Sequence, residues 1–97
     1  MKLTLTKEAD EDLREILGYS IAEFGLKRAE KYYFELQNKF NSILEKASHS
    51  TDYSFVEEGL RRTNYMKHAI FYRSTDQEII IIRVLHQKMD MLRHLKE

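Results

Sequence analysis

The side chains best suited to chemistry lie in the second half of this 97-residue sequence. They are four arginines and two histidines: Arg61, Arg62, His68, Arg73, Arg83 and His86. Arginine stabilises the charge of a pentacoordinate phosphate and histidine moves a proton, so such a set could cleave RNA without a metal. The alternative is that these arginines pair with carboxylates, either those of the helices or those of Glu57, Glu58 and Asp76.

Arg83 is the most informative of these residues because its neighbours Ile81, Val84 and Leu85 are apolar. A guanidinium loses its hydration when it is buried, and only an opposite charge with good hydrogen bonds offsets that cost. We therefore expect an anionic partner beside Arg83.

Metal and cofactor chemistry have little support in the sequence. His86 and Asp90 are four residues apart and could chelate a metal on a helix, but two ligands make a poor site, and we interpret them as surface residues. The absence of cysteine excludes disulfides, cysteine-based zinc sites, iron–sulfur clusters and a thiol nucleophile. Glycine-rich phosphate loops and the standard hydrolase motifs are also missing. We expect no metal and no cofactor.

Length and composition predict one globular domain over residues 1–97, with 42% hydrophobic and 33% charged residues. The longest aliphatic run, 79–82, is far shorter than the roughly 20 residues that a membrane-spanning helix needs. The N-terminus turns acidic after six residues and does not resemble a signal peptide. Because a small secreted domain usually needs disulfides, we predict a cytoplasmic protein with no membrane partner.

Charge is balanced overall, with 16 basic and 16 acidic residues, but it is unevenly distributed. Residues 1–58 hold 8 Lys and Arg against 12 Asp and Glu, whereas residues 59–97 hold 8 against 4. A basic half predicts an anionic partner, either nucleic acid or an acidic protein segment. The alternative is that the two halves neutralise each other within one fold.

Hydrophobic periodicity in the first half predicts a short strand and then two helices. Leu3 and Leu5 alternate with polar residues, and Thr6 can cap a helix that begins with several carboxylates. Apolar residues recur at helical spacing over 9–24, up to Gly25, and again over 29–47. Two helices joined by a glycine turn form an antiparallel hairpin.

The second half has the spacing of strands, which we predict at 60–65, 69–73 and 79–85, before a short helix or extended tail at 87–97. The run 79–82 has too many apolar positions for a strand with one buried face, so we expect it to be covered on both sides or to border a binding groove. The order β-α-α-β-β-β predicts an α+β domain in which the two-helix hairpin packs on an antiparallel β-sheet.

Several short motifs in a fixed order resemble one known family. The pieces are Ala9-x-x-Asp12-Leu13-x-x-Ile16, Phe24-Gly25, Ala29-x-x-Tyr32, Gly59-Leu60-Arg61-Arg62, His68-x-Ile70-x-Tyr72-Arg73 and Arg83-Val84-Leu85-His86-x-x-Met89-Asp90. Their order and spacing resemble the ParE branch of the RelE/ParE toxins of type II toxin–antitoxin modules. The resemblance implies a RelE/ParE-like α+β toxin that a ParD-like antitoxin neutralises. It also implies DNA gyrase as the target and contact with operator DNA only through the antitoxin.

The RelE relatives instead cut messenger RNA on the ribosome, and this remains the alternative function. Arg61, Arg83 and His86 fall at places comparable to the catalytic residues of those nucleases. A lysine-rich stretch before Gly59 and a C-terminal tyrosine, typical of the nucleases, are missing here. We therefore expect a gyrase poison without enzymatic activity of its own. A third possibility is a binding-only module that merely co-regulates its operon with the antitoxin.

Contacts with the antitoxin are predicted in the groove between sheet and hairpin, where an acidic segment that folds on binding would meet the basic half. The candidate apolar contacts are Met66, Phe71 and Tyr72, with charge complementarity from Arg61, Arg62 and Arg73. For the target we predict contacts at the last strand and beyond it: Arg83, His86, Met89, Asp90 and Arg93.

Overall fold

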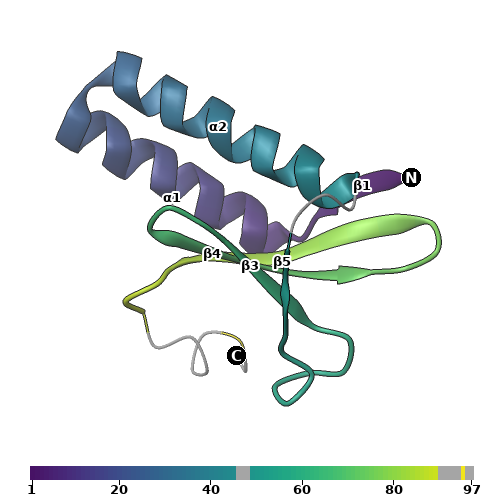
Figure 1. Ribbon diagram of the computed structural model, residues 1–97. Coiled ribbons are helices and arrows are strands. Elements are labelled where there is room, and N and C mark those ends of the chain that lie inside the picture. Colours follow the sequence, from purple (N-terminus) through teal and green to yellow (C-terminus); the bar gives the residue numbers. More distant parts are fainter. Residues whose placement is uncertain (46–48, 90–94, 96–97) are drawn as a thin grey trace.

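A computed structural model describes residues 1–45, 49–89 and 95 of the chain. Its elements follow the order β1 (Lys2–Leu5), α1 (Lys7–Phe24), α2 (Leu26–Leu44), β2 (Thr51–Asp52), β3 (Arg61–Tyr65), β4 (His68–Ser74) and β5 (Glu78–His86). The two helices lie side by side along one face of the sheet (Figure 1). The predicted α+β fold is therefore confirmed, with β2 as a short additional strand.

The strands form a mixed sheet with the spatial order β1-β5-β4-β3-β2. The pairs from β5 to β2 are antiparallel, as predicted, but β1 runs parallel to β5, from Lys2 opposite Glu78 to Leu5 opposite Ile81. A parallel pair needs a long crossover connection, and here the helical hairpin and the strands β2 to β4 lie between the two partners. Because β1 occupies the edge of the sheet, β5 is an interior strand.

An irregularity in β5 explains its unusually apolar sequence. Phe71 lies opposite Arg83 and Tyr72 lies opposite Ile81, so Ile82 is one extra residue, a β-bulge. Ile81 packs with the helix-side core and Ile82 with the cluster on the other face. The extra residue also lets Val84, three positions after Ile81, return to the helix side, which strict alternation would forbid.

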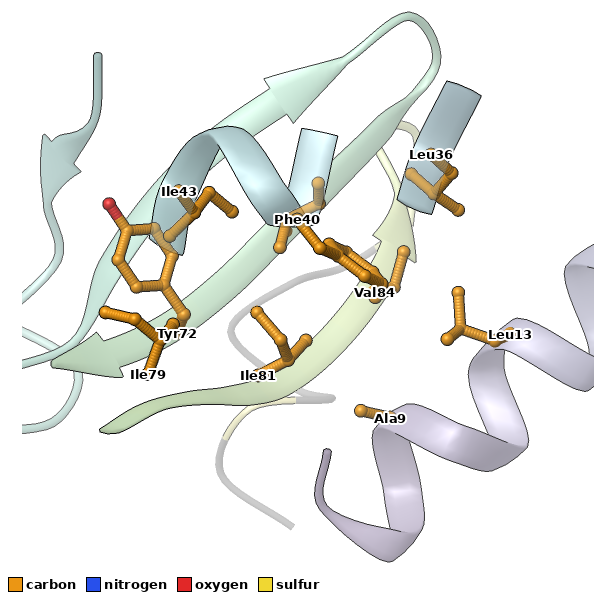
Figure 2. Packing of buried hydrophobic residues seen from close by; sticks show 10 residues of the cluster. Ala9, Leu13, Leu36, Phe40, Ile43, Tyr72, Ile79, Ile81 and Val84 are labelled. Atoms are coloured by element: carbon orange, nitrogen blue, oxygen red, sulfur yellow. The ribbon is translucent and has the colours of Figure 1, made fainter. Parts of the chain in front are cut away.

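Side chains fill both faces of the sheet. The helix side holds the larger cluster, shown in Figure 2, with Leu13, Leu36 and Phe40 of the hairpin against Ile81 and Val84. On the opposite face Leu60, Ala69, Phe71 and Leu85 form a second cluster, against which Tyr53, Val56, Ile82 and Leu95 pack. The expectation that the 79–82 run is covered on both sides is thus met.

Local signals set the ends of the hairpin helices as the sequence indicates. The hydroxyl of Thr6 accepts a hydrogen bond from the Ala9 N–H at 3.0 Å and caps α1. Gly25 separates the helices at φ 85°, a conformation that residues with a side chain rarely adopt. No helix in the described part of the chain is long and apolar enough to span a bilayer.

Candidate functional site

An open groove of about 1280 Å³ lies where the hairpin passes over the ends of β4 and β5. We call it the hairpin groove. It is lined by one side of α1 between Glu8 and Phe24 and by the first turns of α2 from Arg28 to Glu35. The segments 66–68, 83–86 and 88–89 complete the lining. A groove between sheet and hairpin was predicted, and the structure contains one.

Arg83 has the anionic partner that its apolar neighbours demand, and that partner is Asp12 of α1. Arg83 donates through Nε to Asp12 Oδ2 at 2.8 Å and through Nη2 to Oδ1 at 2.9 Å. These bonds to Asp12 raise the pKa of Arg83 above its usual value. For Arg83, the structure thus confirms the alternative in which the arginines pair with carboxylates of the helices.

Asp12 and Thr6 also close the edge of β5 beyond the last residue of β1. Asp12 Oδ2 accepts the Val84 N–H at 2.9 Å, and the Thr6 hydroxyl donates to the carbonyl of Ile82 at 2.8 Å. In the sequence, Asp12 is only one of several acidic residues at the start of α1. A helical signal was present nonetheless, since Asp12 stands four residues before Ile16 and eight before the buried Ser20.

Two histidines face each other across β4 and β5 at the other end of the groove. His68 and His86 are paired in register, and their ring centroids are 5.6 Å apart. The His68 Nδ1 lies 2.6 Å from the Tyr32 hydroxyl, while His86 Nδ1 accepts the Lys88 N–H at 3.1 Å. Because that bond needs an unprotonated Nδ1, a neutral His86 carries its hydrogen on Nε2.

Two tyrosines, Tyr32 and Tyr65, lie beside this pair. The Tyr65 hydroxyl donates to the Glu35 carboxylate, and the rings of Tyr32 and Tyr65 are 5.7 Å apart. Burial, followed by the nearby Tyr65 and Glu35, raises the pKa of Tyr32 to about 12. Burial, followed by the neighbouring His86, lowers the pKa of His68. Sequence analysis missed this assembly because it arises from the cross-strand registers of β3, β4 and β5, which have no local signal in the sequence.

The predicted antitoxin contacts do not gather in one place. Met66 lines the groove and is 67% exposed, but Phe71 and Tyr72 are buried at 0% and 6% exposure. Phe71 belongs to the cluster behind the sheet and Tyr72 to the core beneath the helices. The expectation that these two rings offer contact surface is corrected, because adjacent residues of a central strand bury themselves in opposite faces.

The three arginines proposed beside them lie outside the groove lining. Arg61 donates to Ser50 through Nε at 2.7 Å, and Arg73 pairs with Glu57 at 3.1 Å. Arg62 donates to the Tyr53 hydroxyl at 2.8 Å, and its guanidinium lies 5.7 Å from the centre of the Phe71 ring. Of the predicted pairings with Glu57, Glu58 and Asp76, the structure shows the one between Arg73 and Glu57.

The residues predicted to contact a target are better grouped. Arg83, His86 and Met89 all line the hairpin groove, whereas Asp90 and Arg93 lie outside the described residues. The same limit applies to the pair of His86 and Asp90 considered as metal ligands. Within residues 1–45, 49–89 and 95, no three His, Cys, Asp or Glu side chains are grouped so that they could hold a metal.

Two solved structures share this hairpin-on-sheet fold. The solved structure described as the chromosomal ParDE TA system from P. aeruginosa matches with a TM-score of 0.73 at 19% identity, over 89% of this chain and 95% of that one. The Helicobacter pylori protein HP0894, known from a solution structure, matches with a TM-score of 0.54 at 18% identity. This second match covers 89% of the present chain and 93% of the Helicobacter pylori protein.

The family follows from sequence comparison. A model described as the ParE toxin of the type II toxin–antitoxin system parDE matches residues 3–91, so the chain belongs to the ParE toxin family. Toxin ParE1 of Caulobacter vibrioides is 35% identical over 91 residues, 94% of each chain. Toxin ParE1 of Mycobacterium tuberculosis is 32% identical over 92 residues, also 94% of each.

Proposed function

We propose that this ParE-family toxin acts on DNA gyrase and is neutralised by a ParD-like antitoxin that fills the hairpin groove. The match to the ParE family model over residues 3–91 carries this proposal, because it spans the hairpin and all the strands. The target is assigned by family, since a fold alone fixes no activity. No enzymatic step is part of the proposal.

The lining of the groove supports its role as the antitoxin site. Several of its apolar side chains are largely exposed in the free chain, at 64% for Tyr19, 53% for Phe24, 67% for Met66 and 44% for Met89. Single exposed apolar side chains are normal on a protein surface. Several that gather on one concave surface mark an interaction site. Covering them would also hide His86 and Met89 from a target.

The geometry gives the ribonuclease alternative little support. Arg61 is bound to Ser50 outside the groove lining, and Arg83 is held by Asp12 in a two-bond pair. His86 has its Nδ1 engaged by the Lys88 N–H, so its neutral ring offers no free basic nitrogen on that side. The three residues compared with nuclease catalytic groups therefore do not converge on one phosphate position.

The test is a supercoiling assay with purified gyrase and purified toxin. We expect inhibition of supercoiling or trapped gyrase–DNA cleavage complexes, both abolished when the toxin is first mixed with its antitoxin. A matched reaction with topoisomerase I controls for nonspecific effects on DNA. Unimpaired gyrase, together with messenger RNA cuts in a translating extract, would overturn the proposal in favour of the ribonuclease.

A further inference from the structure

The charges that line the hairpin groove are sorted along its length. Glu8, Glu11 and Glu15 of α1 are exposed and line one part of it, together with Asp12. The cation beside them is Arg83, which Asp12 already binds and whose pKa Glu8 and Glu15 raise further. Four carboxylates against one guanidinium make this end of the groove negative.

The opposite end is positive. Arg28 and Lys31 in the first two turns of α2 are joined there by Lys67 before β4 and Lys88 after β5, all four exposed. The lining carboxylate on α2 is Glu35, which accepts the Tyr65 hydroxyl. Four cations against one carboxylate leave a surplus that suits an anion.

Apolar side chains connect the two ends. On α1 the acidic residues are followed by Ile16, Tyr19 and finally Phe24, whose ring lies 5.5 Å from the Arg28 guanidinium. From Glu8 to Phe24 the helix rises roughly 24 Å at about 1.5 Å per residue. The groove thus presents an acidic end, an apolar middle and a basic end over the span of about seven extended residues.

We propose that the antitoxin segment in this groove carries the complementary order: basic side chains against Glu8, Glu11 and Glu15, apolar ones against Tyr19, and acidic ones against Arg28 and Lys31. This inference rests on the proposed function and deepens it. Such an order also fixes the direction in which the segment runs, because the reversed segment would place like charges together at both ends.

The two simpler anionic occupants fit less well. A uniformly acidic segment, as the basic half of the sequence predicts, would bring its carboxylates against those of Glu8, Glu11 and Glu15. A nucleic acid strand carries phosphates at regular intervals and would meet the same repulsion at that end. Both occupants would bind better, not worse, after the acidic end is reversed, and this difference makes them distinguishable.

The test uses the toxin and the protein encoded in the reading frame beside it, with affinity measured by titration at about 0.05 M and about 0.5 M salt. The acidic end is reversed by Glu11→Lys with Glu15→Lys, and the basic end by Arg28→Glu with Lys31→Glu. Glu23→Lys with Glu30→Lys and the single change Lys27→Glu are controls, because these exposed residues of the same helices lie outside the groove lining.

We expect each groove variant to lose about tenfold or more in affinity at low salt, a smaller factor at high salt, and the controls to change by less than about twofold. A lysine or arginine of the antitoxin changed to glutamate should restore binding to the acidic-end variant alone. Thermal unfolding checks that each variant is folded.

Two results overturn the inference. One is wild-type affinity in both groove variants, and the other is tighter binding of the antitoxin, or of labelled RNA or DNA, after the acidic end is reversed. A folded wild-type chain that binds no antitoxin would instead refute the proposed function, and this inference with it.

Discussion

The Asp12–Arg83 pair joins the first helix to the last strand, and removing one partner should cost stability. Asp12→Ala leaves the guanidinium of Arg83 and the Val84 N–H without their acceptor. We expect the free energy of unfolding to fall by about 2–4 kcal/mol, because the pair is largely buried. Urea denaturation measures this loss, with the exposed Glu11→Ala on the same helix as the control. Equal losses in both variants would contradict a role for the pair.

His68 makes stability depend on pH. Its pKa is lowered in the folded chain, so below the ordinary histidine pKa of about 6.5 the unfolded chain binds more protons than the folded one. Stability should therefore fall as pH drops through and below that value. Urea midpoints measured from about pH 7.5 to about pH 5.5 should fall less in His68→Gln than in the wild type. The exposed His49→Gln is the control and should keep the wild-type slope.

At the residue scale, sequence reasoning could demand a partner for Arg83 but could not choose among the acids of α1. Which of these acids reaches Arg83 depends on how α1 lies over β5. That placement is set by packing between residues that are far apart in the sequence. The histidine pair could not be foreseen for the same reason. His68 and His86 are 18 positions apart in sequence, and only the register of β4 against β5 brings them together.

At the scale of elements, we infer that the bulge in β5 lets Arg83 reach Asp12 of α1, although Arg83 lies opposite Phe71 in the strand register. Deleting Ile82 would leave Tyr72 opposite Ile81 and Phe71 opposite Arg83 in a regular ladder, with Val84 still on the helix side. We expect the deletion variant to fold but to carry Arg83 on the far face of the sheet. Asp12→Ala should then cost less in this variant than in the wild type, a non-additivity that urea denaturation measures. An unchanged cost would show that the bulge does not position Arg83.

Two exposed phenylalanines on the hairpin helices allow a matched comparison, one inside the hairpin groove and one outside it. Phe24 and Phe34 are both more than half exposed, but only Phe24 is part of the groove lining. Phe24→Ala should raise the dissociation rate of the antitoxin complex by about tenfold, as expected for an apolar anchor worth more than about 1 kcal/mol. Phe34→Ala should leave that rate unchanged, and surface-based kinetic binding assays measure both. The reverse ranking would place the antitoxin on the outer side of the hairpin.

Elements were easier to foresee than their pairing. The alternation at Leu3 and Leu5, the cap at Thr6 and the stop at Gly25 are local signals, and each lies where the structure has the matching boundary. The parallel partnership of β1 with β5 has no local signal, because it joins residues 76 positions apart. The apolar run of β5 fitted a strand covered on both faces, yet its bulge is visible only once β4 is placed beside it.

At the scale of the whole molecule, the net charge is zero, so a partner is steered only by the uneven distribution of charge and not by a net charge of one sign. Raising salt from about 0.05 to about 0.5 M shortens the Debye length from about 14 to about 4 Å. We expect the association rate with the antitoxin to fall by less than about tenfold, and the dissociation rate to stay nearly constant because apolar contacts hold the complex. Stopped-flow fluorescence measures both rates. Complete dissociation at high salt would show that charge dominates the affinity.

The pairing of β1 with β5 also has a consequence for how the toxin is made. A ribosome completes β1 and both helices long before β5 exists, and until then the helix-side core lacks Ile79, Ile81 and Val84. Contacts between the two ends of a chain close late in folding, since they require the longest loop. A nascent toxin therefore has no β5 to cover the apolar side of its hairpin between the completion of α2 at Leu44 and the synthesis of β5 from Glu78 onward, and it gains its folded shape only near the end of translation. An antitoxin already present in the cell would meet each new toxin molecule at the moment its groove forms.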